Sequence, residues 1–231
     1  MSVFAISDLH LSVNNPKPMD IFGPTWEGYV DKIFKDWKEN VKDDDIVLMA
    51  GDFSWAMHLE ETKADFDMLR ELPGKIVIIR GNHDYWWKSI SAVRSSLPEK
   101  VYAIQNDALK FGEYIICGTR LWLLPDTNKP LSDEDDKIYK RELIRLEMTL
   151  QNATKLKQGN EKIICMLHYP PYTFKEEDNE VTALLEKYNV NKVVYGHSHA
   201  FCKQNLVLNK NGVEYYLTSC DIVGNKLVKI D

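Results

Sequence analysis

Five short motifs bring together aspartate, asparagine and histidine, the residue types that bind divalent metals through oxygen and nitrogen atoms. They are Asp8-Leu9-His10, Gly51-Asp52, Gly81-Asn82-His83-Asp84, His168 and Gly196-His197-Ser198-His199. The motifs contain five of the six histidines of the chain, so the imidazole groups are concentrated in them. Each motif alone is more often a turn or a surface pair than a functional site. Their joint occurrence is what indicates chemistry.

Seven of these side chains are potential metal ligands. They are Asp8, His10, Asp52, Asn82, His168, His197 and His199. A set of imidazole, carboxylate and amide groups without cysteine suits zinc, manganese or iron, and does not suit a closed structural zinc site. Seven ligands are too many for one tetrahedral ion, so we expect two divalent metal ions that share a carboxylate. Two ions about 3.5–4 Å apart can hold both oxygens of an in-line displacement at phosphorus, which predicts phosphate-ester chemistry.

Short, nearly continuous apolar runs lie directly before the motifs and are typical of buried strands. The runs are residues 2–7, 45–50, 75–80, 114–118, 162–167 and 192–196. In an α/β sheet, ligands bind beyond the carboxyl ends of the strands, and these ends are neighbours in space. We therefore expect the five motifs, which are far apart in the sequence, to meet at one rim.

Amphipathic segments alternate with the early strands. Trp26, Tyr29, Ile33 and Trp37 recur at helical spacing, and a second helical pattern ends before Pro73. This alternation predicts an α/β fold built on largely parallel strands.

Two later segments follow other patterns. Asn211-Gly212 separates two apolar runs and predicts a hairpin, which favours antiparallel strands and a second sheet. Residues 132–157 predict a long helix that begins at Ser132, because serine followed by acidic residues suits a helix start. Its apolar stripe fits packing on the chain's own sheet, which we favour, or a dimer seam. The stripe consists of Tyr139, Leu143, Leu146, Leu150 and Ala153.

The bulk composition excludes several classes of protein. The net charge of −6 leaves no basic footprint, so we do not expect non-specific nucleic-acid binding. No apolar run approaches the ~18 residues of a membrane-spanning helix, and the N-terminus lacks the basic region of a signal peptide. The four cysteines form no C-x-x-C pair, which favours reduced thiols in a cytoplasmic protein. They are Cys117, Cys165, Cys202 and Cys220.

In their order, the five motifs resemble those of the calcineurin-like metallophosphoesterase superfamily, and the rest of the chain resembles its predicted phosphohydrolase branch. The resemblance runs from Asp8 to His199. It implies that residues 1–231 form a single domain with an α/β fold, a four-layer αββα sandwich of two mixed β-sheets flanked by helices. One departure is the stretch GDFSWAMH at 51–58, which lacks the acidic–arginine pair of the protein serine/threonine phosphatases.

The resemblance also implies how the ligands divide between the ions. The first metal ion would be held by Asp8, His10 and His199. The second would be held by Asn82, His168 and His197. Asp52 would bridge the two ions. The metals would be manganese, iron or zinc.

His83 would not bind metal in this scheme. It would face the substrate and protonate the leaving group, and Asp84 would hydrogen-bond to His83 and fix its orientation. The implied activity is hydrolysis of a small phosphomonoester or phosphodiester by in-line attack of a metal-bridging hydroxide. The alternative is a catalytically inactive scaffold for protein interaction, and the presence of both His83 and Asp84 favours the enzyme.

Aromatic residues follow two of the metal motifs directly. We expect Trp55, Trp86 and Trp87 to pack in the core, with stacking on a nucleobase as the less favoured alternative. His58 and Arg120 are further groups able to contact phosphate, and for both we favour a structural or surface role.

Overall fold

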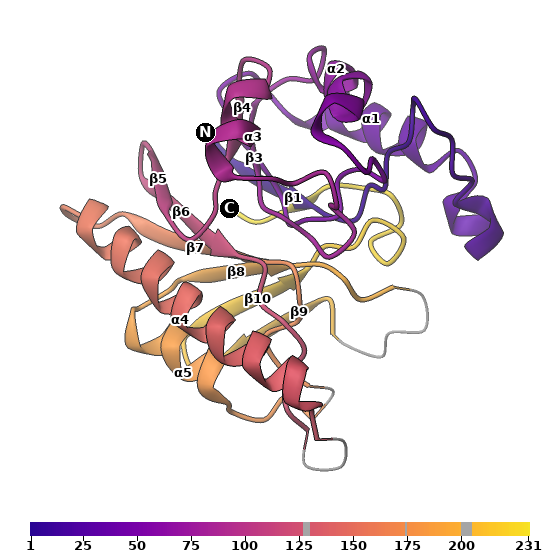
Figure 1. Cartoon of the computed structure of the whole chain (residues 1–231). Coiled ribbons are helices and arrows are strands. Elements are labelled where there is room, and N and C mark those ends of the chain that lie inside the picture. The colour runs from indigo at the N-terminus through magenta and orange to yellow at the C-terminus, as the bar shows by residue number, and fades with distance from the viewer. Residues whose placement is uncertain (127–129, 174, 200–204) are drawn as a thin grey trace.

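Two mixed β-sheets form the centre of the structure, a computed structural model that describes residues 1–126, 130–173, 175–199 and 205–231 (Figure 1). The strand order of the first sheet is β11 (Val228–Lys229), β1 (Val3–Ile6), β2 (Ile46–Met49), β3 (Lys75–Ile78) and β4 (Val101–Ala103). That of the second is β5 (Ala108–Phe111), β6 (Tyr114–Thr119), β7 (Lys162–Leu167), β8 (Lys192–Tyr195), β10 (Val213–Leu217) and β9 (Val207–Lys210). The edge strands β11, β5 and β9 pair antiparallel, and all other pairs are parallel.

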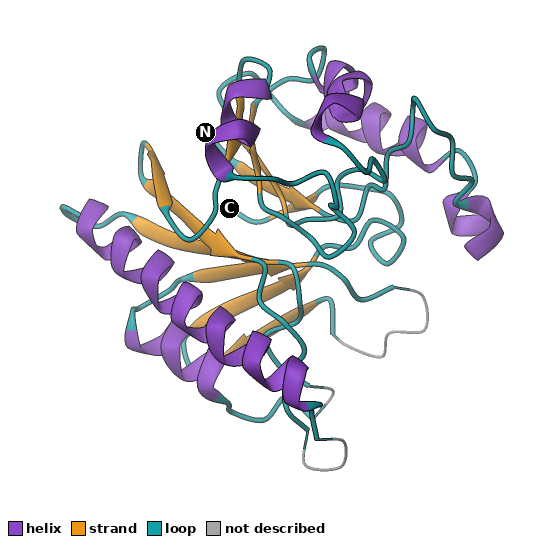
Figure 2. Ribbon diagram, viewed as in Figure 1, coloured by secondary structure: helices purple, strands orange, loops and turns teal. Residues whose placement is uncertain are grey.

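Helices cover the outer face of each sheet (Figure 2). The first sheet carries α1 (Tyr29–Asn40), α2 (Lys63–Leu69) and α3 (Ile90–Ser96), and the second carries α4 (Asp133–Leu156) and α5 (Glu180–Lys187). Short 3-10 helices lie at Asp20–Phe22, Pro24–Trp26 and Leu59–Thr62. These layers confirm the expected four-layer αββα sandwich.

The central strands are apolar on both faces because both faces are buried. In β1, Val3 and Ala5 point into the core between the sheets, while Phe4 and Ile6 pack beneath the helices. Strand β7 alternates in the same way within the second sheet. This double burial is why the strands read as continuous apolar runs rather than as alternating ones.

The expected hairpin joins β9 and β10. Asn211 and Gly212 both have positive φ angles, 50° and 82°, as a tight hairpin turn of this sequence requires. The six strands expected from apolar runs are all present, and β4, β5 and β11 are additional ones. The 3-10 helix that contains Trp26 lies before α1, so the predicted helical spacing extended one turn too far at its start.

The long helix α4 begins where its sequence predicts. The Ser132 hydroxyl accepts a hydrogen bond from the amide of Asp135 at 3.1 Å, which caps the first turn. Four residues of the apolar stripe are buried against the second sheet and the fifth is partly buried there, so the stripe packs within its own chain and is not a dimer seam. The buried four are Tyr139, Leu146, Leu150 and Ala153.

No helix among the described residues is long and apolar enough to cross a membrane. The described cysteines, Cys117, Cys165 and Cys220, are buried and free, and Cys202 lies outside the described residues.

Candidate metal centre

Strands from both sheets end at one rim, and the motifs meet there. In the first sheet these strands are β1, β2 and β3, and in the second they are β7 and β8. Ligand atoms of Asp8, His10 and His199 lie within 4.8 Å of one another, and so do those of Asp8, Asp52 and His168. The structure thus brings together five of the seven expected ligands in two groups that share Asp8.

Asn82 and His197 complete the set on the side of His168. The Oδ1 atom of Asn82 lies 2.6 Å from Nε2 of His168 and 2.9 Å from Nδ1 of His197. Nε2 of His168 is also 3.5 Å from Oδ2 of Asp52. All seven expected ligands therefore lie in one continuous cluster.

Asp52 occupies the middle of the cluster. Its Oδ2 atom lies 3.5 Å from Nε2 of His168 and 3.7 Å from Nε2 of His10. The same atom is buried and has no hydrogen-bond partner among the described residues, whereas Oδ1 accepts the amide of His83 at 2.8 Å. A buried carboxylate oxygen without a partner is costly unless a cation compensates it, so the position fits a metal bridge.

The ring of His168 is held in one orientation from behind. Its Nδ1 atom donates to the carbonyl oxygen of Ala50 at 2.9 Å, so Nε2 of a neutral ring carries a lone pair. That lone pair would face the oxygens of Asn82 and Asp52, which are also acceptors, unless a proton or a metal ion lies between them. Burial lowers the pKa of His168, but the nearby negative charge of Asp52 raises it overall to about 9.

His199 is held in a similar way by Asp221, a residue that the sequence patterns did not indicate. Nδ1 of His199 lies 2.9 Å from Oδ1 of Asp221, which turns Nε2 toward Oδ1 of Asp8 at 3.5 Å. Burial lowers the pKa of His199, but hydrogen bonds to Asp221 and Asp8 raise it to about 10. Asp221 follows β10 at the same rim, so its place after a buried strand was the available signal.

The other two histidines are kept neutral. Burial lowers the pKa of His10 to about 4 and that of His197 to about 4. The His10 ring stacks on Trp55 with ring centroids 4.7 Å apart, and the His197 ring lies 4.1 Å from that of Tyr169. A neutral imidazole has a free lone pair, which is the form that binds a metal.

Four of the seven cluster residues have left-handed backbone. The φ angles are 61° at Asp8, 47° at His10, 53° at Asp52 and 65° at His197. Residues other than glycine adopt this region rarely, and such strained positions concentrate at functional sites. The sharp turns direct these side chains back over the strand ends, and the sequence alone gave no sign of them.

Residues 1–201 match the family model of the calcineurin-like phosphoesterases. The chain belongs to this family. Two solved structures share the fold, and each aligns with 99% of this chain. The protein of unknown function AQ665 from Aquifex aeolicus is 15% identical, with a TM-score of 0.51 and 95% of its own chain covered. TT1561 of Thermus thermophilus is 13% identical, with a TM-score of 0.56 and 97% of its own chain covered. No curated protein matches the sequence.

The metal dependence of the calcineurin-like phosphoesterases agrees with the donor set of this chain. The unpartnered oxygen of Asp52 and the facing acceptors around His168 are observations of the site itself that a bound cation would explain. The residues present therefore fit the metal ions on which the family depends.

Within this site, Asp84 does not form the expected hydrogen bond with His83. The carboxylate of Asp84 is fully buried and accepts five N–H groups at 2.7 to 3.2 Å. The donors are the backbone amides of Asp52, Phe53, Ser54 and Gly81 and the indole of Trp86. Asp84 therefore joins the loop after β2 to the loop after β3. Burial raises the pKa of Asp84 to about 6, and the charge of Asp52 adds to this.

The His83 ring lies beside the cluster on its aromatic side. Its centroid is 4.6 Å from that of Trp55 and 5.6 Å from that of His10, and its Nδ1 is buried without a hydrogen-bond partner among the described residues. The loop amide, not the ring, is what holds His83 to Asp52.

The aromatic residues of the motifs divide between core and site. Trp86 and Trp87 are buried in the core, as expected. Trp55 is only partly buried and stacks on His10, so it is part of the site's wall. His58 is exposed at the start of a 3-10 helix, which agrees with the surface role favoured for it, and Arg120 is half-buried beside Glu142.

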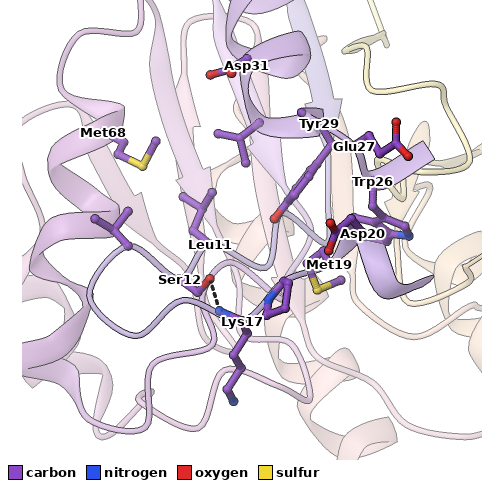
Figure 3. Close-up of a pocket in the computed structure, with 14 residues that line it drawn as sticks. Leu11, Ser12, Lys17, Met19, Asp20, Trp26, Glu27, Tyr29, Asp31 and Met68 are labelled. Carbon is purple, nitrogen blue, oxygen red and sulfur yellow. Dashed lines mark hydrogen bonds between the residues drawn. The ribbon is translucent and has the colours of Figure 1, made fainter. Parts of the chain in front are cut away.

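Two pockets border the cluster. The larger, about 600 Å³, lies between the segment after β1 and the start of α1, where Trp26 lines it (Figure 3). The centroid of the Trp26 ring lies 6.2 Å from that of His10 and 5.7 Å from that of His199. The Trp26 ring therefore separates this pocket from the ligands. The smaller, about 340 Å³, is lined by His197 itself and by Tyr169. Although it is smaller, it opens directly on a ligand.

Proposed function

We propose that this chain hydrolyses small phosphate esters, monoesters or diesters, with two divalent metal ions. The observation that carries the proposal is the cluster of seven oxygen and nitrogen ligands around the unpartnered Oδ2 atom of Asp52. Two carboxylates, an amide oxygen and four imidazoles are more donors than one ion uses, and their arrangement around one carboxylate suits a pair.

Each ion would have ligands from both sheets. The first would be held by Asp8, His10 and His199, the second by Asn82, His168 and His197, and Asp52 would serve both. When bound, such ions neutralise charge on the phosphoryl oxygens and lower the pKa of the water that attacks phosphorus. The chain's own contribution is to fix the ligand rings through Ala50 and Asp221, which saves reorganisation during the reaction.

His83 is the proposed general acid. Its ring centroid lies 5.6 Å from that of His10, and the hydrogen bond from its amide to Asp52 fixes its position relative to the cluster. As an imidazolium it would donate a proton to the leaving oxygen as the bond to phosphorus breaks. The ring of Trp55 packs beside it, tilted by 54°. An inactive interaction scaffold has no need for this histidine, so His83 favours the enzyme.

The proposal treats residues 1–231 as one domain, because the core between the sheets contains residues from both halves of the chain. It also includes a cytoplasmic location, which the free, buried cysteines support.

The test is a screen of Mn²⁺-loaded protein against 4-nitrophenyl phosphate, bis(4-nitrophenyl) phosphate and alkyl esters, with metal content measured in parallel. We expect close to two ions per chain and turnover that chelation abolishes. His83→Ala should lose little on nitrophenyl esters and ~10²–10⁴-fold on alkyl esters, whose leaving groups need a proton. A protein that holds two ions and hydrolyses none of these esters would refute the proposal.

A further inference from the structure

A third pocket, of about 330 Å³, lies at the same rim and concentrates positive charge. Four of its lining residues are arginines and one is acidic, Glu142, in a chain whose net charge is −6. The arginines are Arg80, Arg120, Arg141 and Arg145. No metal ligand lines this pocket, so the site described above does not account for its charge.

The pocket adjoins the metal centre through the backbone. Arg80 directly precedes the Gly81-Asn82 segment that carries one ligand. The carbonyl oxygen of Arg120 accepts the amides of His168 and Tyr169, both at 3.1 Å. The end of β3 and the end of β6 thus each contribute an arginine to the pocket and a connection to the ligands.

Glu142 pairs closely with one of the four arginines, Arg145, and leaves most guanidinium donors of the pocket unpaired. Its Oε1 atom lies 2.6 Å from Arg145 and 3.8 Å from Arg120, and its Oε2 atom accepts the hydroxyl of Thr119 at 3.0 Å. Among the described residues, Nε of Arg80 is buried with no hydrogen-bond partner. Since each guanidinium offers five N–H donors, most donors in the pocket remain available.

We propose that this pocket binds a second anionic group, such as another phosphate, on the substrate whose ester is hydrolysed at the metal centre. The inference rests on the proposed phosphoesterase function. Planar guanidinium groups match phosphate and carboxylate oxygens in pairs. Three of the four here are half-buried and Arg141 is exposed, and such a cluster attracts oxyanions better than dispersed surface charge does. The substrate is then a molecule with two anionic ends, and the pocket selects it over a simple monoester.

The first arm of the test needs no catalysis. Pyrophosphate is titrated into the chelator-treated protein by calorimetry, with Arg145→Gln as the pocket variant and Lys140→Gln as the control. Lys140 lies on the same helix but is exposed, pairs with Asp136 and does not line the pocket. We expect pyrophosphate affinity to fall about tenfold in Arg145→Gln, because a charge-assisted hydrogen bond is lost, and to stay the same in the control.

The second arm measures kcat/KM for alkanediol bisphosphates of increasing chain length and for the matching monophosphates, with Mn²⁺-loaded protein. At one chain length we expect kcat/KM for the bisphosphate to exceed that for the matching monophosphate by about tenfold. We expect Arg145→Gln, but not Lys140→Gln, to abolish this preference. No preference at any length, or equal loss in both variants, overturns the inference.

The two arms separate the failures. If no ester is hydrolysed but pyrophosphate binding still depends on Arg145, the proposed hydrolysis is what fails. Esters could be hydrolysed and pyrophosphate binding could depend on Arg145, while kcat/KM is equal for bisphosphates and monophosphates. In that case the pocket binds a free anion and the inference is wrong.

Discussion

Replacing Asp84 by asparagine distinguishes a structural brace from a catalytic partner of His83. The carboxylate accepts five N–H groups and no bond from the His83 ring. In the most favourable placement, the asparagine oxygen keeps the three donors at Oδ1, and its amide nitrogen then faces the amides of Asp52 and Gly81. Two hydrogen bonds are lost and donors are placed against donors.

The magnitude follows from three contributions. The two lost bonds to a charged group are worth ~1.5–3 kcal/mol each, and the buried amide N–H without an acceptor costs ~1–3 kcal/mol more. In the opposite direction, the raised pKa means that the ionised form of Asp84 is disfavoured in the folded protein. The rise from 3.8 to about 6 corresponds to ~3 kcal/mol of cost that asparagine avoids. We expect Asp84→Asn to destabilise the protein by about 1–6 kcal/mol.

The assay is urea unfolding of chelator-treated protein, followed by metal analysis after Mn²⁺ loading. Because Asp84 holds the amide of Asp52, both the unfolding free energy and the bound metal should fall. The matched control is Asp67→Asn, whose carboxylate pairs at the surface with Lys63 and Arg70 and should leave both unchanged. Unchanged stability and metal content, with a loss on alkyl esters equal to that of His83→Ala, would show that Asp84 acts through His83 after all.

Three further outcomes are expected. Asp52→Asn should abolish binding of the second ion and turnover together, measured by elemental analysis and ester hydrolysis; wild-type turnover at saturating Mn²⁺ contradicts a bridging role. Asp221→Asn should weaken metal affinity by ~10–100-fold, because His199 loses the carboxylate that orients it, and a Mn²⁺ titration equal to wild type would argue against this. Thiol titration without reductant should give slow reaction in native protein, where the described cysteines are buried, and four free thiols after denaturation; two or fewer would indicate disulfides.

The sequence predicted those parts of the fold in which local pattern and burial agree. The run at 162–167 is apolar, β-branched and sharply bounded, and it became β7 at Lys162–Leu167. By contrast, β5 and β11 are short and partly exposed. They exist because β6 and β1 offer them hydrogen-bond partners. Such pairing depends on tertiary neighbours, which no local pattern contains.

The candidate site divides in the same way. The types of the ligands were visible in the motifs, because few other purposes require so many histidines after strands. Partners that come from elsewhere in the chain were not visible, as Asp221 shows. The proximity of Asp84 to His83 in the sequence suggested a hydrogen bond, but the turn directs the two side chains apart and the buried one meets amides of another loop.

The glycines of the motifs explain why the motifs have to occur together. A Cβ atom at Gly81 would overlap the carboxylate of Asp52, which belongs to another motif. At Gly51 it would lie 2.6 Å from the His168 ring, and at Gly196 2.5 Å from the carboxylate of Asp8.

Each of these three glycines therefore makes room for a ligand that a different motif supplies. The loops are packed so closely that the shape of one determines the ligand position of the next, which is also why several ligands need left-handed backbone. We therefore expect substitution of any of these glycines to displace a ligand that is distant in sequence and to weaken metal binding. The metal site is thus formed by the closely packed loops at the rim of the two sheets, and we expect no single motif to be exchangeable without its neighbours.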